Sequence, residues 1–441
     1  MNASTSDPAG GTLISKLLSG APGPVLSHSI SAFWSSSSWR HYLVPAVVGY
    51  LTLCRVLRFR AEKAIRRKLG YTDIESLARM TSTDAQVILN FLTHYEFPLY
   101  SELSLQFALF KTYGIESISK LLVATRNFTE PVKSRKRYED TGAIIGEFLN
   151  NPPSSERHMR SVARMNFLHS RYRAEGAITD ADLLYTLSVF ILEPPRWARL
   201  FDWRPLNDME VCAYAVFWKD VGDAMGIPYA DVMAGPQAGP WGNGLEFAAD
   251  LAAWAKAYEV ERMRPSAVCN KPAVALIPMI TYWVPWFLQP FAQEVVCALT
   301  GDRMREAFML PEPGPLAFSF LYTAFVIRKF VLRYLMLPRF SYLNRLTDPD
   351  PKTGRMHERY TYGNFPFYVK PTFWNRWGPK AWAVWLYGGK LPGDDPEEFM
   401  PEGYTFADLG PRNRAGMGVE EMEADVKKMM ASDRGGCPFR L

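Results

Sequence analysis

The amino-acid sequence predicts an all-α protein built as a helical bundle. Apolar residues recur at helical spacing almost throughout residues 62–330, and no alternation with period two indicates strands. We find no internal repeat of the kind that predicts a solenoid. With 441 residues, the chain can bury one large hydrophobic core or two ordinary ones. We therefore expect a helical body flanked by two terminal segments of different composition.

The composition favours an apolar cavity or a membrane-facing surface. Hydrophobic residues make up 48% of the chain and aromatic residues 14%. The net charge of +5 is too small to indicate a nucleic-acid partner. The five cysteines lie far apart without a CxxC pair. This spacing predicts neither a disulfide framework nor a zinc site, and it fits a reducing compartment.

The N-terminal part predicts a tail followed by a membrane anchor. Residues 1–40 are rich in Ser, Gly, Pro and Ala and are expected to be disordered. Residues 41–58 contain the uncharged run 42–54, and with Trp39, Val56 and Leu57 the apolar element reaches about 16 to 19 residues, which is marginal against the roughly 20 that usually span a bilayer. Two alternatives are a cleaved signal peptide, which would need its positive charge before the apolar run, and an amphipathic or core helix.

The charges beside this anchor predict its orientation. Seven Lys and Arg residues follow within Arg55–Lys68, whereas only Lys16 and Arg40 precede it. Because positive charge stays on the cytosolic side, we expect a single-pass protein with a lumenal N-terminus and a cytosolic body. The glycosylation sequon at Asn2 would then be lumenal, and the one at Asn127 would be cytosolic and unmodified.

Residues 59–338 show helical patterns with recognisable ends. Residues 181–192 are apolar nearly all round and predict a buried central helix that ends at the prolines 194 and 195. Residues 276–299 are apolar but broken by prolines, and they indicate a core or membrane-leaning element rather than a second span. Further helices are predicted at 208–226, with a terminal glycine, at 245–263 and at 316–337. N-caps are predicted at Asp73, Thr83 and Asp180.

His169 is the candidate metal ligand. It follows Val162 and Met165 and precedes Tyr172 at spacings that place all four on one face of a helix. An imidazole on such a face needs a partner, because an unpaired buried polar group costs roughly 1–3 kcal/mol. The alternative is a core histidine that is hydrogen-bonded to a carbonyl.

A search for known catalytic motifs finds no GxSxG, HExxH, P-loop or nucleotide-type GxGxxG sequence. With only six histidines, a multi-histidine metal site has few donors, and a non-haem iron site would require distant positions to converge. Haem iron needs one protein ligand, which His169 could supply. Cys437 superficially resembles the ligand of a haem-thiolate loop, but its place at the chain end favours an ordinary tail cysteine.

Five segments resemble the fungal ER-bound oxygenases of the mycophenolic acid pathway, whose catalytic domain is more distantly similar to that of the bacterial latex-clearing rubber oxygenases. The similarity covers nearly the whole chain from about Tyr42. The segments are Lys136-Arg-Tyr-Glu-Asp-Thr141, Ser161-Val-Ala-Arg-Met-Asn-Phe-Leu-His169, Asp180-Ala-Asp-Leu-Leu-Tyr-Thr-Leu187, Phe217-Trp-Lys-Asp-Val-Gly-Asp-Ala-Met-Gly226 and Phe367-Tyr-Val-Lys-Pro-Thr-Phe-Trp-Asn-Arg-Trp-Gly-Pro379.

The resemblance implies a globin-like helical haem domain over residues 59–338 and a C-terminal extension, 339–441, packed on it. It implies haem b as cofactor with His169 as the proximal iron ligand and O2 as co-substrate. Arg164 becomes a candidate for binding a haem propionate, although a surface salt bridge is an equal alternative. The tryptophans of residues 374–385 become part of a membrane-facing or substrate-facing wall, with ordinary packing as the alternative.

The resemblance also suggests catalytic residues at Arg137, Asp140 and Thr141. The family's Arg-x-x-Lys-Thr pattern falls on residues 137–141, but its lysine position is Asp140 here, which puts a distal role for that position in doubt. From composition alone, Arg137 would be a solvated charge, and Asp140 and Thr141 would be helix caps. The family's acidic base falls near Leu121, where the nearest carboxylates are those of Glu116 and Glu130.

The function implied is an ER-membrane oxygenase that cleaves a C=C bond in the farnesyl (prenyl) side chain of an aromatic polyketide-terpenoid intermediate, with haem iron and O2. Its expected partners are this prenylated small molecule and the ER membrane, with no nucleic acid and with any redox partner left open. Two alternatives stand beside it: a non-catalytic, membrane-tethered carrier of a prenylated metabolite, and a non-haem oxygenase.

Overall fold

The computed structural model describes residues 38–126, 131–233, 239–362, 364–432 and 434–439. The chain divides into two compact units, Met1–Leu57 and Arg58–Leu441. In the first unit, the described residues belong to helix α2 (Ser38–Arg58), which coincides with the predicted anchor. The helical stretch His41–Leu69 is long and apolar enough to cross a membrane. The predicted tail up to residue 37 and both sequons, at Asn2 and Asn127, lie outside the described residues.

The second unit is helical, which confirms the predicted all-α class. No strand occurs among the described residues, and pairing there is limited to the isolated bridges Leu346–Glu358 and Met356–Tyr404. The first helices are α3 (Arg60–Leu69), α4 (Ile74–Leu77), α5 (Ser82–Phe91), η1 (Leu92–Glu96), α6 (Pro98–Thr112), α7 (Glu116–Ala124), α8 (Pro131–Asn150), α9 (Glu156–Ala174) and α10 (Asp180–Phe201). The later helices are α11 (Asp208–Ala224), α12 (Tyr229–Met233), α13 (Gly244–Arg262), α14 (Ala267–Ile280), η3 (Trp286–Leu288), α15 (Gln289–Ala307), α16 (Pro315–Phe330), η4 (Val331–Leu335), α17 (Phe373–Trp377), α18 (Pro379–Leu386), η5 (Phe406–Asp408), η6 (Arg412–Arg414) and α19 (Val419–Met430).

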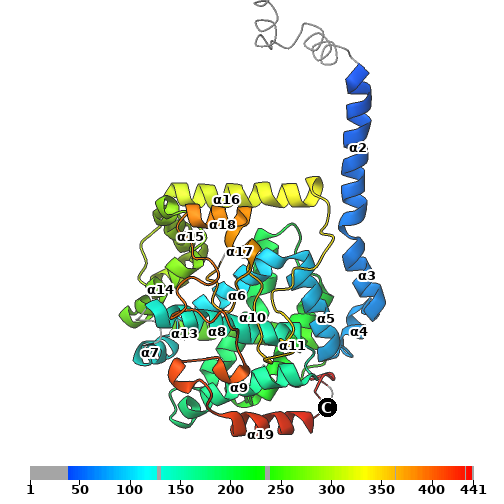
Figure 1. Ribbon diagram of the computed structural model, residues 1–441. Coiled ribbons are helices and arrows are strands. Elements are labelled where there is room, and N and C mark those ends of the chain that lie inside the picture. The colour runs from blue at the N-terminus through cyan, green and yellow to red at the C-terminus, as the bar shows by residue number, and fades with distance from the viewer. Residues whose placement is uncertain (1–37, 127–130, 234–238, 363, 433, 440–441) are drawn as a thin grey trace, which may run out of the picture. The chain divides into compact units, whose positions relative to one another are not determined.

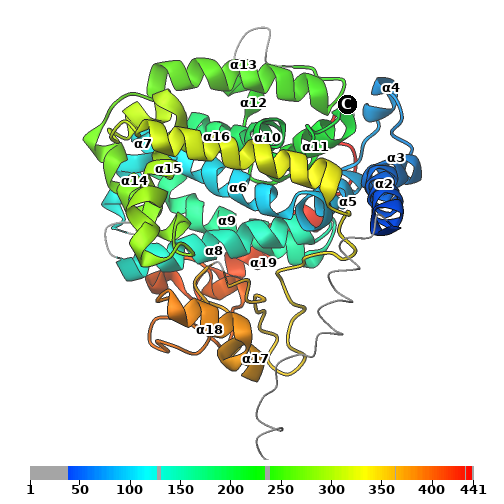
Figure 2. The same ribbon diagram turned by 90° about the horizontal axis from the view of Figure 1, so that it is seen from above.

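Helices α6, α10 and α11 form the centre of the core, and α13 and α16 lie on the outside (Figures 1 and 2). The sequence explains this placement, because α10 and α11 are apolar on most sides and bury most of their side chains. Large aromatic rings fill the contacts between these helices. Phe190 of α10 stacks on Trp218 of α11 with 4.6 Å between ring centroids.

The prediction that the central helix ends at its prolines is wrong. Helix α10 continues through Pro194 and Pro195 to Phe201. Proline removes backbone hydrogen bonds, but packing beyond the prolines compensates. Trp197 is fully buried, and its ring lies 4.8 Å from that of Phe107 and 4.9 Å from that of Phe201. The buried aromatic surface therefore outweighs the local cost of the two prolines.

The predicted helix ends are partly confirmed. Asp73 caps α4 as expected, and Gly226 follows α11 with a positive φ of 66°. Thr83 and Asp180 are not caps, because the residues that cap α5 and α10 are Thr81 and Thr179. The predicted helices 245–263 and 316–337 correspond to α13 and to α16 with η4, and the apolar stretch 276–299 divides among α14, η3 and α15.

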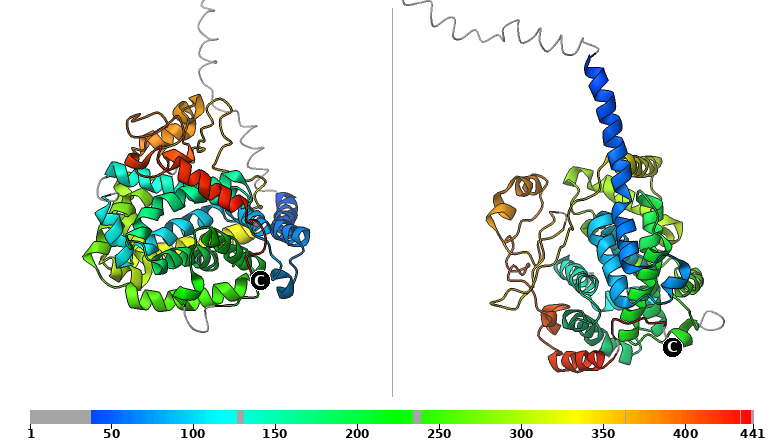
Figure 3. Two further views of the ribbon diagram at one scale, coloured as in Figure 1. Left: turned by 90° about the horizontal axis from the view of Figure 1, so that it is seen from below. Right: turned by 90° about the vertical axis from the view of Figure 1, so that its right-hand side faces the viewer.

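The C-terminal segment runs across several parts of the second unit, as the orange and red ribbon in Figure 3 shows. Helix α19 packs on α9, and Asn166 of α9 donates a hydrogen bond of 2.7 Å to Asp425 of α19. At the chain end, the carbonyls of Gly435 and Gly436 accept hydrogen bonds from the first turn of α5. These carbonyls satisfy N–H groups that have no partner within the helix.

Candidate functional site

A cavity of about 730 Å³ lies inside the helical body. Helices α6, α7, α8, α9 and α10 supply most of its wall, and residues 410–414 of the C-terminal segment complete it. Its volume is within the roughly 300–1,000 Å³ range of small-molecule sites. The lining is mainly apolar and includes Leu121, Leu122 and Leu168. The cavity can therefore hold a large apolar ligand or cofactor.

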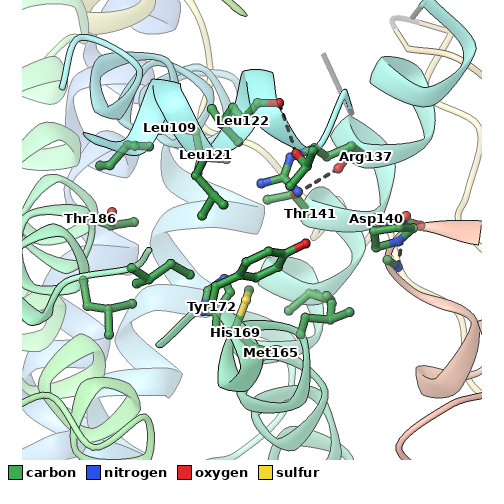
Figure 4. A pocket seen from close by; sticks show the side chains of 18 of the residues that line it. Leu109, Leu121, Leu122, Arg137, Asp140, Thr141, Met165, His169, Tyr172 and Thr186 are labelled. Carbon is green, nitrogen blue, oxygen red and sulfur yellow. Dashed lines mark hydrogen bonds between the residues drawn. The ribbon is translucent and has the colours of Figure 1, made fainter. Parts of the chain in front are cut away.

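His169 projects into this cavity from α9 together with Met165 and Tyr172 (Figure 4). The helical spacing from the sequence thus predicted this face correctly, while Val162 of the same face is buried in the core. The ring is half-buried and borders the cavity. Burial, together with the positive charges of Arg137 and Arg173, lowers the pKa of His169 to about 4. The imidazole is therefore neutral at physiological pH, which is the form that binds metal ions.

The Nδ1 atom of His169 is buried and has no hydrogen-bond partner among the described residues. Leaving such a nitrogen unpaired costs roughly 1–3 kcal/mol. Buried polar groups in native proteins are rarely left so, and an exception points to a missing partner. The alternative of a core histidine that is hydrogen-bonded to a carbonyl does not describe this ring within the described structure.

Arg137 and Thr141 line the same cavity from α8, one helical turn apart. The Thr141 hydroxyl donates a hydrogen bond of 2.8 Å to the carbonyl of Arg137. Because α8 begins at Pro131, Thr141 and Asp140 lie in the middle of the helix, and the alternative that they are helix caps is wrong. Arg137 is half-buried and lines the cavity, which differs from the alternative of a fully solvated charge.

Asp140 borders the cavity, but its carboxylate is directed elsewhere, away from His169 and Tyr172 (Figure 4). It forms a buried salt bridge of 2.8 Å with Lys136, one turn earlier on α8. It also accepts hydrogen bonds from the Tyr368 hydroxyl and, at 3.0 Å, from the Gly410 N–H. Burial raises the pKa of Asp140, and these donors partly offset that effect. The carboxylate thus joins α8 to the C-terminal segment.

Arg164 occupies a different place from the one expected for a propionate ligand or a surface salt bridge. Its side chain is fully buried and is not part of the cavity wall. Its guanidinium donates hydrogen bonds of 2.8 Å to the carbonyl of Leu409, 3.0 Å to that of Arg414 and 2.7 Å to that of Met417. The position of these carbonyls on both sides of residues 410–414 means that Arg164 fixes this part of the cavity wall.

The cavity position that the sequence assigned to an acidic base is apolar. Leu121 lines the cavity, whereas Glu116 pairs with Lys120 at 2.8 Å on the exposed side of α7. Glu130 lies outside the described residues. Asp182 of α10 also borders the cavity, and its carboxylate accepts hydrogen bonds from Ser117 at 2.6 Å and Tyr258 at 3.0 Å. Both carboxylates on the cavity wall, those of Asp140 and Asp182, therefore have structural hydrogen-bond partners.

His169 also borders a second cavity of about 770 Å³, between α9, α11, α19 and the chain end. This second cavity is more polar, with Asp220, Asp223 and Asp425 in its wall. Cys437 contributes to it, but its thiol donates a hydrogen bond of 3.4 Å to the carbonyl of Ala78, which fits an ordinary tail cysteine.

Sequence reasoning missed residues 410–414 and the role of Arg164. Nothing in the sequence indicates contact between segments about 250 residues apart. The ion pair of Asp140 was also missed, although Lys136 and Asp140 have the spacing of four residues that favours an ion pair on a helix.

Comparison with known proteins connects this cavity to a family. The family model described as "ER-bound oxygenase mpaB/B'/Rubber oxygenase, catalytic domain" matches residues 123–328. The chain is 39% identical to ER-bound oxygenase mpaB' of Penicillium brevicompactum over 420 residues, which cover 94% of this chain and 98% of the relative. It is 39% identical to ER-bound oxygenase mpaB of the same organism over 392 residues, which cover 88% and 92%. It is 38% identical to ER-bound oxygenase mpaB of Penicillium roqueforti over 280 residues, which cover 64% and 93%.

Proposed function

Because this chain belongs to the family of ER-bound oxygenases and rubber oxygenases, we propose that it is a haem-dependent oxygenase that cleaves a prenyl C=C bond with O2. Membership of the family makes it an oxygenase, and the relatives are named as ER-bound. The haem, the prenyl substrate and the roles of individual residues are the proposal. The observation that carries it is the neutral imidazole of His169, whose buried Nδ1 has no partner among the described residues, on the wall of a large apolar cavity.

The cavity residues fit a haem. Haem iron needs one protein ligand, and His169 offers a neutral ring whose buried Nδ1 has no partner within the described structure. Among the described residues, no three side chains of His, Cys, Asp or Glu lie close enough together to hold a metal ion. A single histidine with ample apolar space favours a porphyrin over a metal cage built from several side chains. When bound, the haem would supply the iron centre that activates O2.

Arg137 and Thr141 would serve the cavity as a cation and a hydroxyl donor. The Arg137 guanidinium can pair with a carboxylate of the cofactor or favour negative charge that develops on oxygen. Its charge also helps to keep His169 neutral. We assign Asp140 and Arg164 a positioning role, because both hold residues 409–417 and neither directs its charged group into the cavity.

The apolar wall suits a prenyl chain. Leu121, Leu122 and Leu168 would bind it by burial of its surface and would exclude water from the reacting bond. Cleavage of one C=C bond by one O2 leaves an oxygen atom on each of the two carbonyl fragments. This stoichiometry balances without an external reductant. The apolar cavity would therefore contribute what the reaction needs from the protein: binding, orientation and exclusion of water.

The decisive experiment uses the full-length protein in microsomes, made with ample haem precursor. A farnesylated aromatic substrate is supplied, products are identified by mass, and haem is assayed by its Soret band and as the pyridine haemochrome. We expect one haem per chain and two carbonyl products. Absence of both haem and products would support the carrier alternative. Products from protein that contains iron but no haem would support the non-haem alternative.

We further propose that α2 spans the ER membrane once, with the N-terminus in the lumen. The clustered Lys and Arg residues of Arg55–Lys68 support this orientation. Endoglycosidase treatment should increase the mobility of the wild-type protein on gels, and Asn2→Gln should abolish that change. Asn127→Gln is the matched control and should leave it intact. Glycosylation at Asn127 instead of Asn2 would show that the orientation is opposite to the one proposed.

A further inference from the structure

Three segments of the second unit carry exposed apolar side chains, and we call them together the lipid face. They are residues 283–288, helix α16 and residues 373–386, which contain α17 and α18. The segments are joined by direct contacts. Phe291, just after the first segment, lies 5.3 Å from Phe320 of α16 between ring centroids. Tyr282, just before it, accepts a hydrogen bond from the Lys390 N–H, just after α18.

The exposure of this face is extensive and rich in aromatic side chains. Trp286 is 73% exposed, Tyr322 74% and Leu386 75%. Among the described tryptophans, six are exposed, and all six lie on the lipid face: Trp283, Trp286, Trp374, Trp377, Trp382 and Trp385. Figure 2 looks onto α16, and α17 and α18 are visible in the same view near its lower edge. Exposed apolar surface on this scale marks an interaction site.

The charges within the face have one sign, and acidic residues such as Glu312 and Asp395 occur only beyond the ends of its segments. No Asp or Glu occurs in residues 281–293, 313–347 or 359–393. These stretches contain several Lys and Arg residues, and Arg333, Arg339 and Lys380 are exposed without an ion-pair partner among the described residues. An apolar surface that is rich in tryptophan and bordered by cations complements the headgroup region of an anionic bilayer.

Helix α16 lies along the body. It is apolar and long enough, with η4, to cross a membrane. However, Phe325 packs on Phe201 of α10 with 4.4 Å between ring centroids, and Arg328 forms a salt bridge of 3.5 Å with Asp202. Near the same end, Lys329 donates a hydrogen bond of 3.1 Å to the carbonyl of Arg199. These contacts hold one side of the helix on the protein, so its other side meets the surroundings along its length.

We propose that the lipid face inserts into the interfacial layer of the bilayer, with α16 parallel to the membrane plane, as an attachment separate from α2. Amphipathic helices bind membranes in this way, with the apolar side in the acyl boundary and cations at the headgroups. A second copy of the chain fits less well, because two faces bordered by positive charge would repel each other. The proposal does not depend on the haem or on the prenyl substrate.

The experiment places spin labels on the full-length chain in lipid nanodiscs. Cys437→Ser removes the one described cysteine that is not buried. Single labels are then attached through Tyr322→Cys or Leu386→Cys on the face, and through Val260→Cys on α13 as the control, since Val260 is also exposed and apolar. Collision rates with O2, which enters lipid, and with a nickel chelate, which stays in water, report the surroundings of each label.

We expect the ratio of O2 to nickel collision rates at positions 322 and 386 to exceed that at position 260 by roughly fivefold or more in discs of phosphatidylcholine and phosphatidylinositol. Omitting phosphatidylinositol should reduce this difference by roughly twofold. Equal ratios at all three positions would overturn the proposal. Protection accompanied by magnetic broadening between labels on two chains would overturn it in favour of a contact between copies.

A second pair of variants tests whether the apolar side chains of the lipid face cause the high collision ratio at position 322. Trp385→Glu together with Leu386→Glu should return the label at position 322 toward the water-accessible ratio, because buried charge in the apolar layer is costly. Val260→Glu together with Val419→Glu makes the same change at exposed apolar positions outside the face and should have no effect. Unfolding temperatures of both variants should match the parent, since all four side chains are exposed.

Discussion

The two histidines of α9 show how one helix can carry a structural group and a candidate ligand. His158 lies near the start of the helix, and its Nδ1 makes a hydrogen bond of 3.1 Å with the carbonyl of Phe148. Its Nε2 lies 3.4 Å from the guanidinium of Arg434. His169, three turns later, borders the cavity with an Nδ1 that has no partner in the described part of the chain. Both imidazoles are kept neutral by burial, so the availability of a nitrogen distinguishes them rather than the protonation state.

The largest effect is expected from His169→Ala. Loss of the proposed iron ligand should abolish the Soret band and lower product formation by about a thousandfold, equivalent to about 4 kcal/mol. The free energy of unfolding of the apoprotein should change little, because the ring loses no hydrogen bond. Haem content, turnover and urea denaturation are measured on the same preparation. Full haem content in the variant would contradict the assignment.

His158→Ala should instead lower the stability of the protein and leave haem binding intact. Removing a fully buried ring with two partners should lower the free energy of unfolding by about 2–4 kcal/mol. The folded fraction should still bind haem and turn over substrate. Urea denaturation gives the first quantity, and haem content per folded chain gives the second. If His158→Ala lost haem without loss of stability, the distinction between the two histidines would fail.

Arg137→Met should produce a smaller change, which affects the pKa of His169 but not that of His158. Without the nearby positive charge, the pKa of His169 should rise toward its ordinary value, while that of His158 should stay low. Turnover should fall by about tenfold if the guanidinium favours negative charge in the cavity. Imidazole proton resonances, followed against pH in the apoprotein, report both pKa values. Arg434→Met is the matched control and should raise only the pKa of His158.

A further effect is the joint contribution of both histidines to acid sensitivity. In the unfolded chain each imidazole takes up a proton near its ordinary pKa of 6.5, whereas folding lowers the pKa of His169 to about 4 and that of His158 to about 3. The unfolded state therefore binds more protons below pH 6.5, and the free energy of unfolding should fall as the pH is lowered toward 4. Replacing either histidine with Gln should make this slope shallower in urea denaturation from pH 7 to pH 5.

Helical patterning was enough to predict much of the fold. The interior helix α11 carries apolar residues on most sides and ends at a glycine, and both features are visible in the sequence. The continuation of α10 past Pro195 was not predictable from local rules, since it depends on the burial of Trp197 against Phe107. Tertiary packing overrides a local preference when the buried area is large.

The candidate site could likewise be predicted from the sequence only in part. The helical spacing of Met165, His169 and Tyr172 predicted a shared face, and the structure places these residues at one cavity. The surroundings of Arg164 could not be predicted, because its partners are backbone carbonyls, which every sequence contains. Sequence patterns thus indicate which side chains share a face, but not which distant backbone segment meets them.

The dependence of the cavity wall on residues 410–414 has a consequence for biosynthesis. A nascent chain cannot enclose the cavity until these residues have left the ribosome and docked on Arg164. A fragment that stops at residue 328, where the family match ends, lacks that side of the chamber altogether. Completion of the cavity wall therefore waits for a segment that is translated well after the helices it docks on, and a chain that lacks this segment would leave the chamber open to water.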